Sequence, residues 1–154
     1  MRQFNDPGEP RNNLVMIVDD DDAFLCEMQE VLESSGYHVL RATTSSQALT
    51  LARASRPDVF LLDLKLGADS GFELARQLRH AAQPADPPVI AMTGYFNMAA
   101  CNRMISCYGI TACLQKPFHP RDVIAAIEQA LAAGPVNRPA TESAPKSIET
   151  MEGA

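Results

Sequence analysis

Residues 57–71 read PDVFLLDLKLGADSG, a short apolar run that ends abruptly on a carboxylate. The run Val59–Leu62 has β-branched and aromatic character, and its length predicts a strand buried on both faces. Asp63 ends this strand, and the Gly, Asp and Ser residues within 67–71 predict a loop behind it. Open α/β sheets place their ligands at the carboxyl ends of such strands, so Asp63 is a candidate site residue, although, taken alone, an ordinary strand end that caps nearby amides is the better explanation.

Strands alternate with helices five times along the chain. Apolar, β-rich runs predict strands at Leu14–Val18, His38–Ala42, Val59–Asp63, Val89–Met92 and Ala112–Leu114. Helical periodicity, capping residues and glycines predict helices from Asp21 or Asp22 to Gly36, from a capping box at Thr44–Gln47 to Arg53, from Phe72 to His80, from Met98 to Gly109, and from Pro120 onward. Short connections between such elements predict βαβ units, and therefore a parallel sheet with helices on both faces.

The composition is that of an ordinary globular protein. Hydrophobic residues make up 46% and charged residues 21% of the 154 residues, enough for one domain with a proper core. We expect this domain at residues 14–133, with a flexible arm at 1–13 and a disordered tail at 134–154. No apolar run approaches a membrane span and the arm is too polar for a signal peptide, so we expect a cytoplasmic protein with no membrane contact.

Charge and cysteine content argue against several function classes. A net charge of −6 without any Lys/Arg cluster argues against direct DNA binding, which needs a basic face. The four cysteines form no CxxC pair, so zinc and redox motifs are unsupported. Because the cysteines fall in predicted core segments, we expect reduced, buried thiols at Cys26, Cys101, Cys107 and Cys113.

Polar side chains stand at the carboxyl ends of four predicted strands: Asp19 with Asp20, then Asp63, Thr93 and Lys116. In a parallel sheet these ends lie along one edge, so the side chains should converge. Carboxylates about 4 Å apart repel each other by about 1–4 kcal/mol unless a cation neutralises them, and oxygen ligands suit Mg²⁺. Each residue alone has an ordinary explanation, such as a solvated acidic turn or a surface lysine, and only their coincidence indicates a site.

Such a set of residues suits the transfer of a phosphoryl group. Asp63 would be the nucleophile, Mg²⁺ would neutralise the phosphate oxygens, and Lys116 and Thr93 would each bind another oxygen. The sequence has no GxxxxGK[ST] loop for a nucleotide. The phosphate must therefore arrive on a donor that has already activated it.

Several motifs occur in a fixed order: Val18-Asp19-Asp20-Asp21, Pro57–Asp63, Asp69–Leu74, Met92-Thr93-Gly94 and Lys116-Pro117-Phe118. In this order and spacing, over about residues 14–133, the chain resembles the receiver domain of bacterial two-component response regulators. The resemblance implies a doubly wound, flavodoxin-like α/β fold with a five-stranded parallel sheet in the order 2-1-3-4-5.

The resemblance also implies phosphorylation of Asp63 by a sensor histidine kinase or a histidine phosphotransfer protein. Mg²⁺ would be bound by Asp20, Asp63 and the backbone carbonyl of Lys65, with Asp19 acting mainly through water, and Lys116-Pro117 would be a cis peptide. Receivers catalyse their own phosphorylation and dephosphorylation without being dedicated enzymes. Output would pass to an unknown downstream protein, onward in a relay, or through a homodimer formed by the fourth helix, the fifth strand and the fifth helix.

Two positions depart from the family pattern. Gly67 stands where proline is common, and Cys113 stands three residues before Lys116, where an aromatic switch residue usually lies. Thr93 and Cys113 are therefore the expected switch residues. A cysteine fills little volume and has one rotatable side-chain angle, so we expect a muted change at the output surface. The alternative is that Cys113 is a small core residue and that another group, Tyr95 or Tyr108, signals instead.

Three other interpretations share parts of this pattern. A flavodoxin-like cofactor binder should have Gly, Ser and Thr after the first strand, where this chain has four aspartates. A phosphatase of the haloacid dehalogenase type should have a second Asp two residues after the nucleophile, where Lys65 stands. A receiver-shaped scaffold that is never phosphorylated would not need the full acid set.

Overall fold

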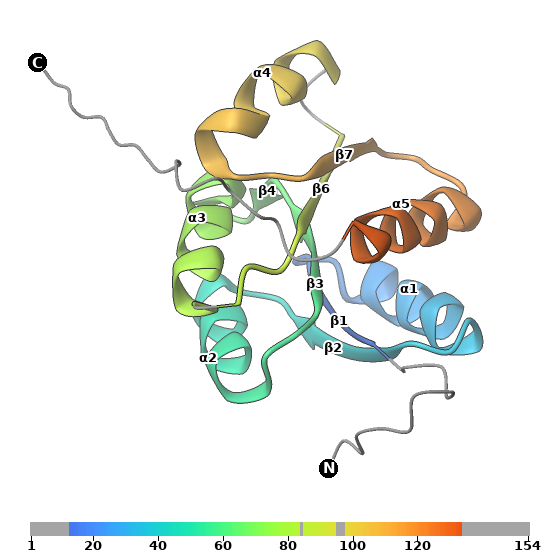
Figure 1. Ribbon diagram of the computed structural model, residues 1–154. Helices are drawn as coiled ribbons and strands as arrows, with labels where there is room; N and C mark the ends of the chain where they lie inside the picture. The colour runs from blue at the N-terminus through green and yellow to red at the C-terminus, as the bar shows by residue number, and fades with distance from the viewer. Residues whose placement is uncertain (1–12, 84, 95–97, 134–154) are drawn as a thin grey trace, which may run out of the picture.

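The computed structural model describes residues 13–83, 85–94 and 98–133, and a five-stranded parallel sheet forms its centre (Figure 1). The strand order is β2-β1-β3-β6-β7, which is the predicted order 2-1-3-4-5 of the main strands. The strands are β1 (Leu14–Val18), β2 (His38–Ala42), β3 (Val59–Asp63), β6 (Val89–Thr93) and β7 (Ala112–Gln115). The predicted tail, and the predicted arm apart from Asn13, lie outside the described residues.

Helices cover both faces of the sheet (Figure 1). They are α1 (Asp22–Ser34), α2 (Ser45–Ser55), α3 (Gly71–Ala81), α4 (Met98–Tyr108) and α5 (Pro120–Ala132). One core cluster joins the sheet to α1 and α5, and the other joins it to α2, α3 and α4. None of the helices in the described part of the chain is long and apolar enough to cross a membrane.

Alternation along the strands divides the core between the two faces. On β1, Val15 and Ile17 pack beneath α1 and α5, whereas Met16 and Val18 pack on the opposite side. Successive strand side chains point to opposite faces, so a strand with helices on both sides must be apolar at every position. The first four residues of β3 are apolar and buried for this reason, and the buried carboxylate of Asp63 at its carboxyl end is the exception. Each fully buried large aliphatic side chain stabilises the fold by about 1.5–3 kcal/mol.

Local sequence sets the helix ends. Asp21 is the N-cap of α1, because its side chain accepts hydrogen bonds from two backbone N–H groups of the first turn. Gly36 follows this helix with φ +98°, a left-handed conformation that glycine adopts without strain. At α5, Pro120 occupies the first turn, as the sequence predicted, and His119 and Asp122 form a capping box that was not predicted.

A short hairpin replaces the loop predicted after β3. Its strands β4 (Lys65–Leu66) and β5 (Asp69–Ser70) are antiparallel, and Gly67 in the connecting turn has φ +57°. A two-residue hairpin turn requires such a backbone conformation, so glycine suits this position better than the proline common in the family. The hairpin is tied to α2 by a hydrogen bond from Ser45 Oγ to Asp69 Oδ2 of 2.9 Å.

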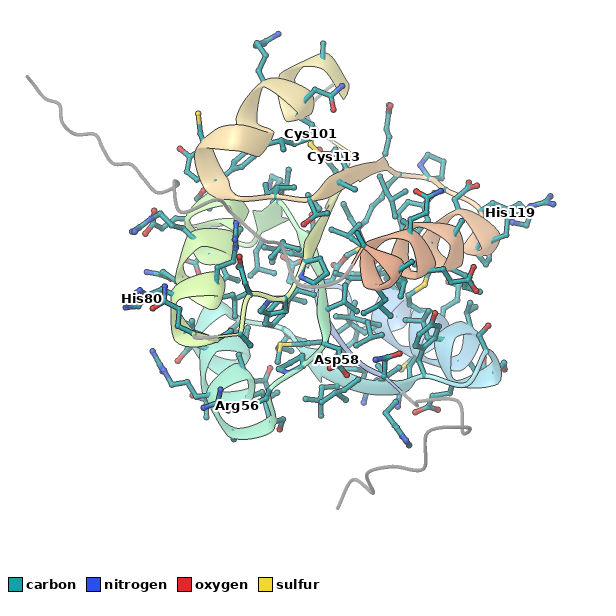
Figure 2. All side chains as sticks on the ribbon, in the orientation of Figure 1. Arg56, Asp58, His80, Cys101, Cys113 and His119 are labelled. Atoms are coloured by element: carbon teal, nitrogen blue, oxygen red, sulfur yellow. A yellow bond between two sulfur atoms is a disulfide. The ribbon has the colours of Figure 1, made fainter. Side chains whose placement is uncertain are left out.

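The prediction of four reduced, buried thiols was wrong. Cys101 of α4 and Cys113 of β7 form a disulfide (Figure 2). Cys26 and Cys107 are exposed. Cys26 faces solvent because the buried stripe of α1 runs through Leu25, Met28 and Leu32. The packing of α4 against β7 brings the Cα atoms of the disulfide pair to 6.6 Å, within the range of disulfides.

Arg79 joins the ends of α3 and α4. Its guanidinium donates to Asp86 Oδ1, with Nε at 2.9 Å, and to the carbonyl of Gly109 at 2.8 Å. Gly109 has φ +72°, and a Cβ there would collide with the guanidinium. Glycine therefore both ends α4, as predicted, and makes room for this contact.

Candidate functional site

The predicted strand ends meet at one edge of the sheet. Asp19 follows β1, Asp63 is the last residue of β3, Thr93 is the last residue of β6, and Lys116 follows β7. Asp19, Asp20 and Asp63 each offer a carboxylate oxygen, and these oxygens all lie within 4.8 Å of one another. The structure therefore brings together three carboxylates from two strand ends that are far apart in the sequence.

The backbone around Asp63 is fixed on two sides. The residue is 7% exposed, and its Oδ1 accepts a hydrogen bond of 3.0 Å from the N–H of Lys65. The N–H of Leu64 donates to the carbonyl of Met92 on β6. Gly71 N–H donates to the carbonyl of Leu64, and a Cβ on Gly71 would clash with the backbone of residues 63 and 64. Glycine at position 71 therefore allows α3 to begin directly against the backbone of Asp63 and Leu64.

The other two carboxylates differ in exposure. Asp19 is fully buried, and its Oδ1 accepts a hydrogen bond of 3.0 Å from the N–H of Asp21. Asp20 is exposed, and its Oδ2 accepts a hydrogen bond of 2.9 Å from the N–H of Gly67. This last contact links the end of β1 to the hairpin turn beyond Asp63.

Lys116 supplies a positive charge to the acidic cluster. Its Nζ lies 2.7 Å from Asp19 Oδ2 and 3.5 Å from Asp63 Oδ2. The ammonium also lies 4.4 Å from the ring centroid of Phe24, which packs edge-on against Phe118. A cation over an aromatic face is stabilised by about 0.5–2 kcal/mol, so the ring helps to hold the ammonium in place.

The backbone after β7 also matches expectation. Lys116 N–H donates to the carbonyl of Thr93 at 2.8 Å, and the Lys116-Pro117 peptide is cis, as the resemblance implied. Thr93 is almost completely buried, one residue beyond Met92, the register partner of Asp63. The part that its hydroxyl plays, like that of the Lys65 carbonyl, stays a prediction.

Burial and charge shift two pKa values. Burial raises the pKa of Asp63, and the negative charge of Asp19 raises it further, against the hydrogen bond from Lys65 and the charge of Lys116. Burial by itself would lower the pKa of Lys116, but the hydrogen bond and charge of Asp19 and the charge of Asp63 outweigh it and raise the pKa. The surroundings therefore favour the charged form of Lys116 and disfavour the charged form of Asp63.

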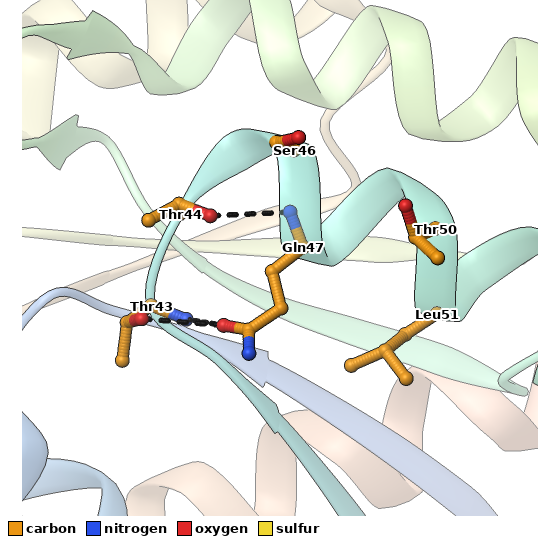
Figure 3. Close-up of a pocket in the computed structure, with 6 residues that line it drawn as sticks. All are labelled: Thr43, Thr44, Ser46, Gln47, Thr50 and Leu51. Atoms are coloured by element: carbon orange, nitrogen blue, oxygen red, sulfur yellow. Dashed lines mark hydrogen bonds between the residues drawn. The ribbon is translucent and has the colours of Figure 1, made fainter.

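A shallow depression lies at the beginning of α2 (Figure 3). Its polar groups cap the helix: Thr44 Oγ1 accepts from the N–H of Gln47, and the Gln47 side chain accepts from the N–H of Thr43. The predicted capping box is thus half formed, since Gln47 bonds the residue before the cap. The groups that line it carry no charge and lie outside the acidic cluster, so the depression is a helix cap and not part of the candidate site.

Two supporting residues were not singled out by the sequence. Phe24 lies in the predicted apolar face of α1, and no local pattern indicates that its ring supports Lys116. Gly71 stands inside a quoted motif, but its close contact with the backbone of Asp63 depends on how α3 docks. For Gly71, the available signal in the sequence was a glycine directly before an apolar helix.

The model of the response regulator receiver domain matches residues 15–128 of the chain. Polar-differentiation response regulator DivK of Brucella anthropi is 36% identical over 103 residues, which cover 67% of this chain and 83% of DivK. The alkaline phosphatase synthesis transcriptional regulatory protein PhoP of Bacillus subtilis is 29% identical over 143 residues, which cover 92% of this chain but 57% of PhoP.

Solved structures show the same fold. A CheY-like response regulator receiver domain protein from Methanospirillum hungatei superposes with a TM-score of 0.71 at 30% identity, covering 79% of this chain and 94% of that chain. A response regulator protein from Burkholderia pseudomallei superposes with a TM-score of 0.68 at 29% identity, covering 80% of this chain and 76% of that chain. The second was crystallised with a phosphorylated aspartic acid, a calcium ion and citrate.

Proposed function

The chain belongs to the response regulator receiver domain family, and we propose that it accepts a phosphoryl group on Asp63. The donor would be the phosphohistidine of a sensor histidine kinase or of a histidine phosphotransfer protein. The phosphorylated chain would then signal by binding another protein, or pass the phosphoryl group onward. The family match and the acidic cluster at the sheet edge support this proposal.

Asp63 is buried, unlike Asp20, and one of its oxygens is held less closely than those of Asp19; this combination carries the proposal. Asp19 is fully buried, with one oxygen bonded to a backbone N–H and the other 2.7 Å from the Lys116 ammonium. Asp20 is exposed and bonded to Gly67. Asp63 Oδ2 lies 3.5 Å from the ammonium, a longer contact that leaves this oxygen better placed to attack an incoming phosphorus.

The donor set fits a hard divalent cation. Three carboxylate oxygens lie within 4.8 Å of one another, and three negative charges with one ammonium leave the cluster at −2. Asp19, Asp20 and Asp63, with the carbonyl of Lys65, would hold Mg²⁺, which when bound neutralises charge on the phosphoryl oxygens. The calcium ion and phosphorylated aspartic acid in the Burkholderia pseudomallei relative are consistent with such a pairing in this family.

The chain's own residues then perform the transfer. Asp63 Oδ2 forms a bond to phosphorus, and the bond from phosphorus to the donor's imidazole nitrogen breaks, its electron pair leaving with the imidazole. The Lys116 ammonium donates a hydrogen bond to one phosphoryl oxygen, and the Thr93 hydroxyl, at the end of the neighbouring strand, donates to another. Hydrolysis of the acyl phosphate by water restores the Asp63 carboxylate.

Phosphorylation by a small donor tests the proposal without knowledge of the kinase. The full chain would be incubated with acetyl phosphate, with Mg²⁺ or with EDTA, and its intact mass measured. We expect one phosphoryl adduct that requires Mg²⁺ and is absent from Asp63→Asn. Asp69→Asn is the matched control, because Asp69 is an exposed carboxylate of the neighbouring hairpin and should leave the adduct unchanged.

Each contrary outcome has a definite meaning. An adduct that persists in Asp63→Asn would move the phosphorylation site to another residue. A wild-type chain that gains no adduct from acetyl phosphate or phosphoramidate would favour a receiver-shaped scaffold. Stable copurification of a flavin would favour the cofactor-binding interpretation.

A further inference from the structure

The disulfide between Cys101 and Cys113 joins two elements that flank the proposed output path (Figure 2). Cys101 is fully buried in α4, and Cys113 is partly buried in β7. Within residues 13–83, 85–94 and 98–133 this is the one disulfide. It fixes one point on α4 to one point on the edge strand of the sheet.

We propose that Cys101 and Cys113 form a reversible dithiol–disulfide pair whose oxidation state sets how far α4 responds when Asp63 is loaded. This proposal rests on the proposed phosphoacceptor function. A low-molecular-weight disulfide is the oxidant: the two thiols form the S–S bond and lose two electrons and two protons, and the oxidant leaves as two thiols. Reduction by a dithiol reverses the step.

β7 leads from the disulfide directly into the site. Lys116 stands three residues after Cys113, and its ammonium contacts both Asp19 and Asp63. In the sheet, Cys113 pairs with Ala91 on β6, two residues before Thr93. When a phosphoryl group engages Lys116 and Thr93, β7 or β6 can shift. Such a shift reaches Cys113 through the strands themselves.

α4 has a second, noncovalent connection to the site. The Tyr108 ring lies 5.0 Å from the Phe72 ring, measured between centroids, with the planes tilted by 40°. Phe72 directly follows Gly71, which packs against the backbone of Asp63 and Leu64. When the disulfide is open, this contact and ordinary packing hold α4, and the helix can shift with Phe72. When the disulfide is closed, Cys101 also holds α4 to β7.

The different exposure of the two cysteine residues suits reversible exchange. Cys113 is the partly exposed member of the pair, so an attacking thiolate reaches its sulfur more easily than that of the buried Cys101. The exposed Cys26 and Cys107 are free thiols, and their removal leaves the pair intact. The variant Cys26→Ser/Cys107→Ser therefore provides a full-length chain in which the pair supplies all remaining thiols.

Linkage makes the coupling measurable in both directions. If closing the disulfide opposes the loaded arrangement of α4, loading Asp63 must oppose closing the disulfide by the same factor. Couplings between sites are typically about 5–150-fold. We expect beryllium fluoride, a phosphoryl mimic, to shift the dithiol–disulfide equilibrium of the pair by at least about 5-fold toward the dithiol.

The experiment uses the Cys26→Ser/Cys107→Ser chain in glutathione buffers of graded redox ratio, with and without Mg²⁺ and beryllium fluoride. Alkylation followed by intact mass gives the fraction of disulfide. Amide chemical shifts of the fully oxidised and fully reduced forms give the extent of the response. We expect changes confined to the surroundings of Asp63 and Lys116 in the oxidised form, and changes extending along α4 in the reduced form.

Cys113→Ser in the same background should behave as the reduced form in every buffer, and chemical reduction of the parent gives the same comparison if a variant fails to fold. Complete alkylation of both cysteines in oxidising buffer overturns the proposal, as does an identical response in the two forms. Absence of any response at Asp63 in both forms overturns the proposed function and this proposal with it, while the mass measurement still reports the disulfide.

Discussion

Replacing Gly71 with alanine should disrupt the site through the backbone. The added Cβ would lie 2.6 Å from the carbonyl oxygen of Asp63 and 2.8 Å from the carbonyl carbon of Leu64, with the Leu64 Cα closer still. These are backbone atoms of a buried strand end, so they cannot rotate away as a side chain would. Overpacking typically costs about 1–3 kcal/mol, and rigid neighbours place this case near the upper end. Alanine restricts the unfolded chain and returns about 0.4–1 kcal/mol, leaving a net loss of about 2 kcal/mol.

Thermal unfolding of Gly71→Ala would test this value. For a folded region of this size, a loss of about 2 kcal/mol lowers the Tm by roughly 6–12 °C. The rate of phosphorylation by acetyl phosphate should fall further than the folded fraction explains, because Asp63 itself is displaced. Gly94→Ala is the matched control, since its Cβ would meet only Lys116 Cβ at 3.9 Å, an ordinary contact. A Gly71→Ala protein that melts within about 2 °C of the wild type would refute the reasoning.

Three further changes probe the charges and contacts of the described residues. Lys116→Met should lower the free energy of unfolding by about 2 kcal/mol in EDTA, less than the loss of a fully buried pair, because the lysine side chain is 27% exposed. Mg²⁺ should raise the Tm of this variant more than that of the wild type, and equal rises would contradict the role assigned to Lys116 beside Asp19. Asp63→Asn should raise the Tm in metal-free buffer near neutral pH. The pKa of Asp63 is raised on folding, so its ionisation lowers the free energy of unfolding of the wild type as pH rises above about 4. A gain in Tm that does not shrink toward pH 4 would count against this. Arg79→Ala should cost about 2 kcal/mol, because its two partly buried contacts, with Asp86 and the Gly109 carbonyl, are lost. Arg76→Ala removes only an exposed ion pair and should leave the denaturation midpoint unchanged, so equal midpoints for the two variants would contradict the role of Arg79.

The sheet could be predicted from sequence because its evidence is local. A run that is apolar at every position, bounded by turn residues, has few alternatives to a strand with helices on both sides. The first three strands have the predicted bounds, and β6 and β7 each extend one residue further, where Thr93 pairs with Gln115. The β4–β5 hairpin was missed because its support comes from Ser45 and Asp20, which are distant in sequence.

The convergence of the acidic cluster could also be predicted, because the ends of parallel strands must share an edge. The same topology does not determine which side chain supports a neighbour. The ring of Phe24 under Lys116 depends on how α1 docks, and the Cys101–Cys113 link depends on how α4 docks on β7. Cys26 was predicted to be buried but is exposed. It follows the buried Leu25 on α1, and one step along a helix is a rotation of about 100°, enough to turn a side chain toward solvent.

The acidic cluster works against the stability of the fold that carries it. Three carboxylates share one ammonium, and burial raises the pKa of Asp63 because nothing nearby compensates its charge fully. A core that is apolar on both faces of the sheet supplies the free energy that tolerates this arrangement. A bound divalent cation would add the positive charge that the cluster lacks, and its binding to the folded chain would stabilise the fold. The elements that meet there, the hairpin, the start of α3 and the strand leading to Lys116, are therefore the ones through which loading of Asp63 can alter the rest of the molecule.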